Sequence, residues 1–204
     1  MIGKEKMSAH KASSSVPKKS AADRLCEVAT DLFYKRGIRA VGVDEIVHET
    51  GVTKPTLYRS FASKDDLVAA CLRSKMEESV ARWDAIAERL PDDPLGQIRA
   101  ILSDFAKEVA APDYRGCALT NAAVEFPEIG HPASKVSQEC KASLRHRLVD
   151  LSRRLTMSDP DALADGLLLL VEGASNSRHT SGSQGPSAAL VKTAETLIQG
   201  HLGH

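Results

Sequence analysis

The stretch Val52-Thr-Lys-Pro-Thr-Leu-Tyr-Arg-Ser-Phe61 decides how the N-terminal part of the chain folds. Thr53 is a good N-cap and Pro55 falls in the first helical turn, so the pattern predicts a short helix beginning near residue 54. Its apolar stripe holds only three residues, Val52, Leu57 and Phe61, too few to contribute much to a core. The other side chains are therefore expected on an outer, polar face: Thr53, Lys54, Thr56, Tyr58, Arg59 and Ser60.

A second short helix is predicted just before this stretch, from Val43 to about Thr50. Gly51 follows it and can adopt the left-handed conformation that a sharp turn needs. Two short helices joined in this way have the geometry of a helix-turn-helix. Their apolar side chains would pack against a first helix that begins after the N-cap Ser20 and stops at Gly37.

The polar face suits the reading of DNA, because the second helix of such a pair enters the major groove. Thr56 can contact a base edge or a thymine methyl, Arg59 and Lys54 can bond guanine or phosphate, and Tyr58 and Lys64 can reach phosphates. The N–H groups at the start of the 43–50 helix offer another phosphate site. The predicted DNA-binding residues are Gly42, Val43, Thr53, Lys54, Thr56, Leu57, Tyr58, Arg59 and Lys64. On spacing alone, a structural helical hairpin with a solvated polar face is the alternative.

The segment from about residue 20 to residue 72 resembles the DNA-binding domain of the TetR (tetracycline-repressor) family of bacterial regulators. The matching motifs are Phe33-(x)3-Gly37, Val43-Asp-Glu-Ile46, Gly51-Val-Thr-Lys-Pro-Thr-Leu-Tyr58 and Phe61-x-Ser-Lys-Asp-Asp-Leu67. The resemblance covers about a quarter of the chain. It implies that the Tyr-x-x-Phe pair ends the recognition helix and that Ser63-Lys64 starts the helix leading to the rest of the protein.

Two positions depart from the family pattern. A Thr or Ser usually precedes the second helix, whereas this chain has Val41-Gly42. Gly is an acceptable N-cap, but one phosphate contact through a hydroxyl is lost. Position 59, often His in the family, is Arg here, which implies a stronger electrostatic contact or a different base preference.

The remainder of the chain also reads as helical. We predict helices over about 63–90, 94–111, 115–126, 132–156, 159–177 and 186–200, with a flexible connection over 178–186. Strand alternation is not seen, so the fold class is all-α with about nine helices. The predicted domains are a disordered basic tail (1–19), a helix-turn-helix DNA-binding domain (20–72), and a ligand-binding and dimerisation domain (73–204).

The resemblance implies that the last two helices pair with their copies in a homodimer. Their apolar content supports this, since it exceeds what one small bundle needs. A dimer suits helix-turn-helix readers, because two copies reach successive major grooves about 34 Å apart on a near-palindromic operator. The predicted interface residues are Leu163, Leu167, Leu170, Val171, Leu190, Ala194, Leu197 and Ile198.

Polar residues on otherwise apolar helices are candidates for an effector pocket. The segment from Gly116 to Pro127 resembles one that lines the cavity in a branch of the family. With aromatic residues at only 4%, we expect a modest, largely apolar effector with one or two polar groups. The predicted lining residues are Trp83, Phe105, Cys117, Asn121, Val124, Glu125, Cys140, Leu144, Glu172 and Asn176, each of which could instead be plain core or a helix-end contact.

Composition limits the class of protein. The 204 residues are 42% hydrophobic and 26% charged, ordinary values for a globular chain. Residues 1–64 hold 12 Lys and Arg against 7 Asp and Glu, whereas residues 65–204 hold 15 against 20, an asymmetry that suggests two roles. Neither a membrane-span pattern nor a signal peptide is seen, and the four cysteines are scattered, so a cytoplasmic protein without metal or cofactor is expected.

The sequence therefore predicts a homodimeric, effector-responsive transcriptional regulator, a repressor released from DNA by a small molecule. A dimeric DNA-binding regulator with no effector is the main alternative. An enzyme would need a nucleophile and a base, for which Cys117, His131, Cys140 and His146 could be imagined. No motif fixes their geometry, so we do not expect an enzyme.

Overall fold

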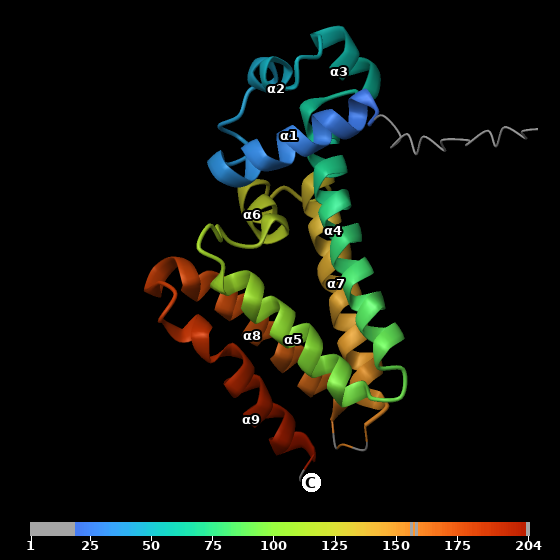
Figure 1. The fold of residues 1–204 in the computed structure, drawn as a ribbon, viewed down its shortest axis with the longest axis vertical. Coiled ribbons are helices and arrows are strands. Elements are labelled where there is room, and N and C mark those ends of the chain that lie inside the picture. The colour runs from blue at the N-terminus through green and yellow to red at the C-terminus, as the bar shows by residue number, and fades with distance from the viewer. Residues whose placement is uncertain (1–18, 156, 158, 203–204) are drawn as a thin grey trace, which may run out of the picture.

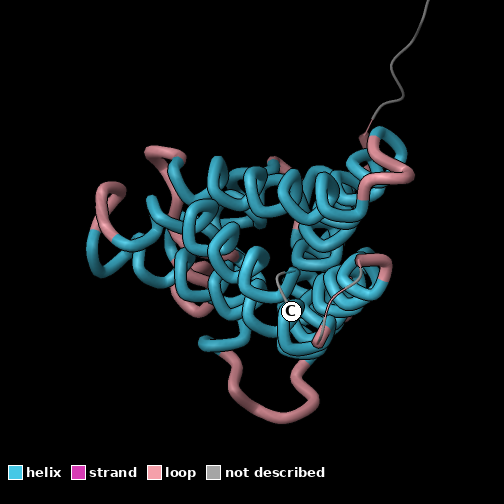
Figure 2. Tube along the Cα trace, turned by 90° about the horizontal axis from the view of Figure 1, so that it is seen from below, coloured by secondary structure: helices cyan, strands magenta, loops and turns pink. Residues whose placement is uncertain are grey.

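The structure is a computed structural model that describes residues 19–155, 157 and 159–202; the predicted tail lies outside this range except for Lys19. Over the described residues the chain forms helices and loops only, as Figure 2 shows, which confirms the all-α prediction. The helices are α1 (Ala21–Arg36), α2 (Val43–Thr50), α3 (Lys54–Ser60), α4 (Lys64–Arg89), α5 (Pro94–Ala110), α6 (Ala118–Glu125), α7 (Pro132–Arg153), α8 (Pro160–Ser181), the 3-10 helix η1 (Pro186–Ala189) and α9 (Leu190–Leu202).

Local signals in the sequence set the ends of the first helices. Ser20 and Asp23 form a reciprocal capping box at the start of α1. Gly51 takes a left-handed φ of 64° between α2 and α3, and Thr53 caps α3 by accepting the Thr56 N–H. Leu57 of α3 is fully buried, and α1 packs against both short helices, so the three form one unit at the top of Figure 1.

Helix α4 connects this N-terminal unit to the rest of the protein. It has 26 residues, so it extends about 39 Å. Its first turns bury Leu67 and Val68 and pack against α1, and its later turns run beside α7 (Figure 1). The helix passes without a break through residue 72, the predicted domain boundary, so both parts share one rigid element.

Helices α5 to α9 form a second bundle, called here the body. Helix α7 packs against α4, α6 and α8, while α9 packs against α5 and α8. Helix α6 is short and lies at the end of the body that faces α1, as Figure 1 shows. None of the described helices has the length and apolar character required to cross a bilayer.

Several predicted helix boundaries were wrong in the body. The last predicted helix, 186–200, is divided into η1 and α9, and α9 ends at Leu202. Helix α6 begins at Ala118 instead of residue 115, because Gly116 adopts a φ of 92° that a helix cannot continue. Helix α7 ends at Arg153, before residue 156. Helix α8 continues past residue 177 to Ser181, where Arg178 Nε donates to the Val109 carbonyl and His179 stacks on Tyr114. These tertiary contacts hold a turn that local sequence assigns to a loop.

Candidate DNA-binding surface and junction cavity

Helix α3 presents the polar face that the sequence predicts. Thr53, Lys54, Arg59 and Ser60 are exposed, and the side chain of Tyr58 is 51% exposed. Leu57 has no exposed surface, because it packs inward on the helix-turn-helix core. Its prediction as a DNA-binding residue is therefore wrong for the side chain, and only its backbone could approach a nucleic acid.

The hydroxyl groups on α3 are partly engaged with one another. Thr53 Oγ1 accepts the Thr56 N–H at 3.4 Å and lies 3.0 Å from Thr56 Oγ1. This arrangement fixes both rotamers at the start of the helix, which is the end that approaches the bases when such a helix enters a groove.

The two basic residues of α3, Lys54 and Arg59, differ in whether a carboxylate already holds their charge. Lys54 Nζ lies 2.5 Å from Asp44 Oδ1 in the first turn of α2, and this hydrogen bond raises the pKa of Lys54. Arg59 is exposed, and no described residue forms an ion pair with its guanidinium. Arg59 can therefore contact a phosphate or a base directly. Lys54 must first break its ion pair with Asp44.

Lys64 does not lie where the sequence predicts. Its Nζ donates to the Ile38 carbonyl at 2.6 Å and sits 5.9 Å from the centre of the Phe33 ring. Burial lowers the pKa of this lysine. The ammonium therefore fastens the turn between α1 and α2, and the predicted phosphate contact does not fit this position.

The start of α2 supplies backbone donors. Gly42 is an exposed N-cap with no side-chain cap hydrogen bond, and Val43 is half-buried beside it. Asp44 and Glu45 occupy the first turn, and Glu45 pairs with Arg36 of α1. The N–H groups remain suited to an anion, although two carboxylates lie close by.

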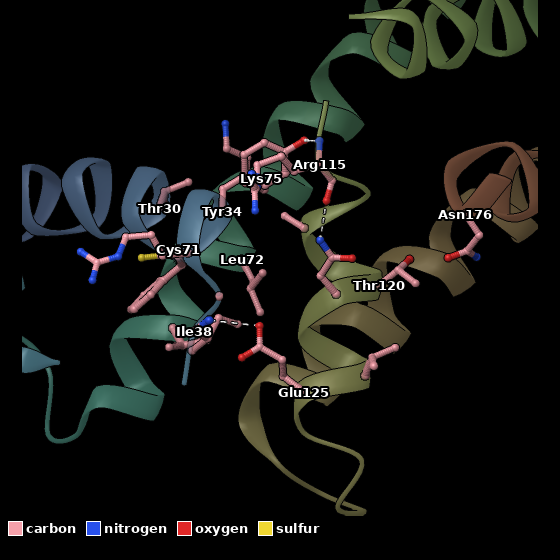
Figure 3. A pocket seen from close by; sticks show the side chains of 17 residues that line it. Thr30, Tyr34, Ile38, Cys71, Leu72, Lys75, Arg115, Thr120, Glu125 and Asn176 are labelled. Carbon is pink, nitrogen blue, oxygen red and sulfur yellow. Dashed lines mark hydrogen bonds between the residues drawn. The ribbon is translucent and has the colours of Figure 1, made fainter. Parts of the chain in front are cut away.

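A cavity of about 460 Å³ lies where the N-terminal unit meets the body. Figure 3 shows side chains from α1, α4, α6 and α8 converging on it. We call it the junction cavity. Its apolar lining comes mainly from Phe33, Val68, Leu72 and Val124, and its polar lining includes Tyr34, Arg115, Thr120, Asn121, Glu125 and Asn176.

Two hydrogen-bond systems cross the junction cavity from the body to the N-terminal unit. Tyr34 Oη accepts the Arg115 N–H at 2.8 Å, and the Arg115 carbonyl accepts from Asn121 Nδ2 at 2.9 Å. The carboxylate of Glu125 accepts the N–H groups of Ile38 at 3.0 Å and Arg39 at 2.9 Å. Glu125 and Ile38 are both labelled in Figure 3, joined by a dashed line.

The structure brings together four of the ten predicted pocket residues. Asn121, Val124, Glu125 and Asn176 line the junction cavity. The other six do not line it: Trp83, Phe105, Cys117, Cys140, Leu144 and Glu172.

Those six residues have structural surroundings of their own. Trp83 is buried with its ring 6.4 Å from that of Phe105, and Cys140 and Leu144 are buried in the core between helices. Glu172 pairs with Lys141 and accepts from Thr120, while Lys141 Nζ also lies 3.6 Å from Cys117 Sγ. They were predicted because polar or aromatic residues on apolar helices can line a pocket, but here they pack or pair within the body.

No pattern in the sequence predicts the residues that line the junction cavity on the α1 side. Phe33 and Tyr34 fit the pattern of an ordinary first helix and were not predicted as lining residues. Tyr34 accepts the N–H of Arg115, in the loop before α6, although the two positions are 81 residues apart. Only the tertiary fold reveals such a pairing.

Most of the predicted dimer residues are core residues of the single chain. Six of the eight are buried within the protomer: Leu163, Leu167, Val171, Leu190, Ala194 and Ile198. Leu170 and Leu197 are half-buried. The prediction that these six residues form the interface is therefore wrong, because they lie on the inward faces of α8 and α9, which pack on α5 and α7. The outward apolar side chains are instead Leu169, 72% exposed, and Val191, 46% exposed.

Among the described residues, no hydrogen bond or ion pair joins any two of the four residues imagined for catalysis. His131 accepts the Ala133 N–H, stacks on Phe126 and lies 3.5 Å from Asp65, and His146 pairs with Asp150. Burial raises the pKa of the Cys140 thiol to about 11. Over the described part of the chain, no three His, Cys, Asp or Glu side chains are grouped so as to hold a metal ion.

Comparison with known proteins gives matches in one family. Residues 25–71 match the family model for bacterial regulatory proteins of the tetR family. The transcriptional activator FasR of Mycolicibacterium smegmatis is 33% identical over 90 residues, 44% of this chain and 41% of the relative. The repressor KstR2 of Mycobacterium tuberculosis is 32% identical over 82 residues, 40% of each chain. The chain thus spans about 40% of the length of these curated relatives.

A solved structure matches over nearly the whole fold. SCO4454, a TetR-family transcriptional regulator from Streptomyces coelicolor, has a TM-score of 0.83 and 30% sequence identity with this chain. The match covers 89% of this chain and 96% of that one, so the body is included as well as the helix-turn-helix.

Proposed function

The chain belongs to the TetR family of bacterial regulatory proteins, and we propose that it binds a near-palindromic operator as a homodimer and is released by a small-molecule effector. As a helix-turn-helix transcriptional regulator it would act on DNA in the cytoplasm. Its curated relatives include an activator and a repressor, and we propose repression for this chain.

The observation that carries the proposal is the exposed polar face of α3. Leu57 anchors the helix in the core while Lys54, Tyr58 and Arg59 point outward. A helix of seven residues with one buried side chain contributes little to packing, so its outer face is available for binding. The face combines hydrogen-bonding groups with the charge of Arg59, which forms no ion pair with any described residue, as base and phosphate contacts require.

The junction cavity is the proposed effector site. Its volume of about 460 Å³ falls within the range of small-molecule pockets. Phe33, Val68 and Leu72 give an apolar wall, while Tyr34 and Asn121 supply polar groups. This lining suits a modest, largely apolar molecule with one or two polar groups. The cavity borders both the N-terminal unit and the body, so occupancy can bias how the two are oriented.

The outer face of α8 and α9 is the proposed dimer interface. Leu169 and Val191 are large apolar side chains left exposed there, and Gly173 leaves open space above the helix backbone. Burial of such a face in a second copy would remove apolar surface from water. The prediction of a dimer through the last two helices is retained, with Leu169 and Val191 as its central residues.

Release would follow from a population shift. An effector that binds more tightly to a form with wrongly spaced reading helices lowers the fraction of protein able to bind DNA. Couplings of this kind are typically about 1–3 kcal/mol, or roughly 5- to 150-fold in affinity. Helix α4 is the expected lever, because Val68 and Leu72 line the cavity while the same helix packs on α1.

A dimeric regulator without an effector is the second candidate. Cys140 and Leu144 are buried inside the body and Trp83 of α4 is buried against it, which favours a body that serves only dimerisation. Thermal unfolding with a panel of small apolar molecules separates the two candidates. An effector site predicts that some molecule raises the melting temperature and weakens DNA binding, and that Asn121→Ala reduces both effects.

The DNA-binding proposal is tested by fluorescence anisotropy on the intergenic DNA flanking the gene and on scrambled DNA. We expect tight, sequence-dependent binding that is lost in Tyr58→Ala and Arg59→Ala. Lys107→Ala on α5 is a matched control for loss of a basic residue and should bind normally. Equal, salt-sensitive binding to both DNAs would indicate only nonspecific binding to phosphates, and the operator would then be selected from a random pool of duplexes. No binding to any duplex at low salt would overturn the proposal.

A further inference from the structure

We propose that Glu125 is the positioning residue through which the state of the junction cavity reaches the helix-turn-helix. The inference rests on the proposed function, since it concerns how occupancy of that cavity would alter DNA binding. Glu125 lies at the end of α6, and its carboxylate lines the cavity. The same carboxylate holds the backbone that leads into α2.

Glu125 grips the turn between α1 and α2 at two adjacent backbone positions. Oε1 accepts the Ile38 N–H at 3.0 Å, and Oε2 accepts the Arg39 N–H at 2.9 Å. Gly37 precedes them with a φ of 88°, and a Cβ at that position would lie 3.5 Å from Oε1. The paired hydrogen bonds fix both the position and the orientation of the turn relative to α6.

The gripped turn is firmly connected to the reading helix. Ile38 is 5% exposed and Val41 is fully buried, so the turn is anchored on both sides of Arg39. Lys64 Nζ donates to the Ile38 carbonyl, which joins the same peptide to the first turn of α4. The chain then enters α2 at Val43, and α2 packs against α3. A displacement of the turn therefore moves the helix-turn-helix as a unit.

Other contacts between the body and this turn are weaker and lie away from the cavity. Arg39 Nη2 is 3.6 Å from Glu128 Oε1, and both side chains are 61% exposed. The Arg39 guanidinium also lies 5.0 Å from the centre of the Phe126 ring. Neither Glu128 nor Phe126 lines the junction cavity. Among the described residues of the body, Glu125 alone both lines the cavity and hydrogen-bonds to the turn.

A ligand in the cavity would compete with the hydrogen bonds from Ile38 and Arg39 to Glu125. A carboxylate only accepts hydrogen bonds, so an N–H or O–H donor on a ligand would engage the same oxygen atoms that hold Ile38 and Arg39. An apolar group pressing on the wall formed by Val124 would shift the end of α6 directly. Either event releases the turn, and the orientation suited to DNA is lost.

The test fills the junction cavity with a larger side chain of the protein itself, in place of a ligand. Ala118 lines the cavity from the first turn of α6, so Ala118→Phe would fill it. The probe is a duplex selected from a random pool on the wild-type protein, and its dissociation constant is measured for wild type, A118F, E125A and the double variant. Glu128→Ala is the matched control, because it removes a carboxylate that contacts Arg39 outside the cavity.

We expect A118F to weaken binding of the selected duplex about tenfold in the wild-type background. In the Glu125→Ala background, which itself binds a few-fold more weakly, the same filling should change affinity less than twofold. E128A should respond to A118F as wild type does. Amide hydrogen exchange at Ile38 and Arg39 should accelerate in A118F and in E125A alike. If circular dichroism shows that A118F is misfolded, Val124→Trp fills the cavity from the same helix.

Three outcomes would overturn the inference. The filling could weaken DNA binding equally in both backgrounds, it could have no effect in the wild-type background, or the Ile38 and Arg39 amides could stay protected when the cavity is filled. Each of these leaves DNA binding by the wild-type protein intact. Failure of the proposed function would look different, since the random pool would then yield no duplex that the wild-type protein binds.

Discussion

The ammonium of Lys54 on α3 lies 2.5 Å from the carboxylate of Asp44 in the first turn of α2. One of the two cations on the reading helix is thus held by a carboxylate from the neighbouring helix of the same motif. Both side chains are exposed, so the pair can open when a phosphate approaches. Asp44 then acts against indiscriminate binding, because a phosphate must displace it before it gains Lys54.

Asp44→Asn should therefore bind every duplex more tightly at low salt, by about fivefold. The freed Lys54 adds roughly one phosphate contact, so the slope of log K against log salt should become more negative by about 0.9. Anisotropy titrations at several salt concentrations measure both quantities. Asp104→Asn, which removes the same charge from α5, is the control and should leave the slope unchanged. An unchanged slope in D44N would show that Lys54 does not contact phosphate.

Gly116→Ala should destabilise the fold by about 1–3 kcal/mol. Gly116 has a φ of 92°, and a Cβ there would lie 2.7 Å from His179 Nε2 and 2.9 Å from Asn121 Oδ1. Urea unfolding followed by circular dichroism gives the free energy of unfolding. Gly200→Ala is the matched control, since a Cβ at that helical position meets nothing within 4 Å. It should be neutral or stabilising by about 0.5–1 kcal/mol, and a similar loss in both variants would contradict the steric argument.

The ion pair between Arg99 and Glu195 should make stability depend on pH. Arg99 Nε donates to Glu195 Oε2 at 2.9 Å, and this contact lowers the pKa of Glu195 to about 2. Because the folded pKa lies below the unfolded one, the contribution is complete above about pH 4.5 and is lost as the pH falls toward 2. The contribution is small, since both side chains are exposed to solvent, by 47% for Arg99 and 38% for Glu195.

Glu195→Gln tests this pH dependence through the free energy of unfolding at pH 7, 4.5 and 3. The wild-type protein should be more stable than E195Q at pH 7, and the difference should shrink at pH 3. Glu77→Gln on α4 changes the same charge without disturbing an ion pair seen in the described residues. The difference in the free energy of unfolding between E77Q and wild type should not shrink at pH 3. A constant difference for E195Q across the range would contradict the assignment.

If the proposed dimer forms through α8 and α9, Leu169→Glu and Val191→Glu should convert it into monomers, because each places a charge in the proposed apolar contact between copies. Size-exclusion chromatography with light scattering measures the mass in solution. Ile129→Glu is the control, since Ile129 is a fully exposed apolar residue in the loop before α7 and should not affect assembly. If L169E and V191E both remained dimeric, the interface would lie on another face.

The fold could be predicted from the sequence where local signals act alone. Gly51, Thr53 and Ser63 set the ends of α2, α3 and α4, because caps and left-handed glycines act within a few residues. The start of α6 could not be predicted, since the positive φ of Gly116 depends on its packing against His179 and Asn121. The last turn of α8 was missed for a similar reason, namely its contact with Val109.

The binding surfaces were predicted less completely than the fold. Periodicity identifies an apolar residue without saying which neighbour it faces, so Leu163 and Leu169 are equivalent in sequence. In the structure Leu163 is buried and Leu169 is 72% exposed. The lining of the junction cavity could not be predicted for the same reason. Glu125 accepts a hydrogen bond from Ile38, which lies 87 residues earlier in the sequence. No local pattern carries such a contact.

Trp83 is the only tryptophan of the chain, and it lies in the second half of α4, buried beside Phe105 of the body. Helices α1 to α3 carry no such fluorophore. Tryptophan emission therefore follows the packing of α4 against the body, whereas far-ultraviolet circular dichroism follows the helices of both parts. Coincident curves from the two signals would mean that the continuous helix α4 makes the protein one cooperative unit, and a helical loss that precedes the emission change would mean that the N-terminal unit melts first.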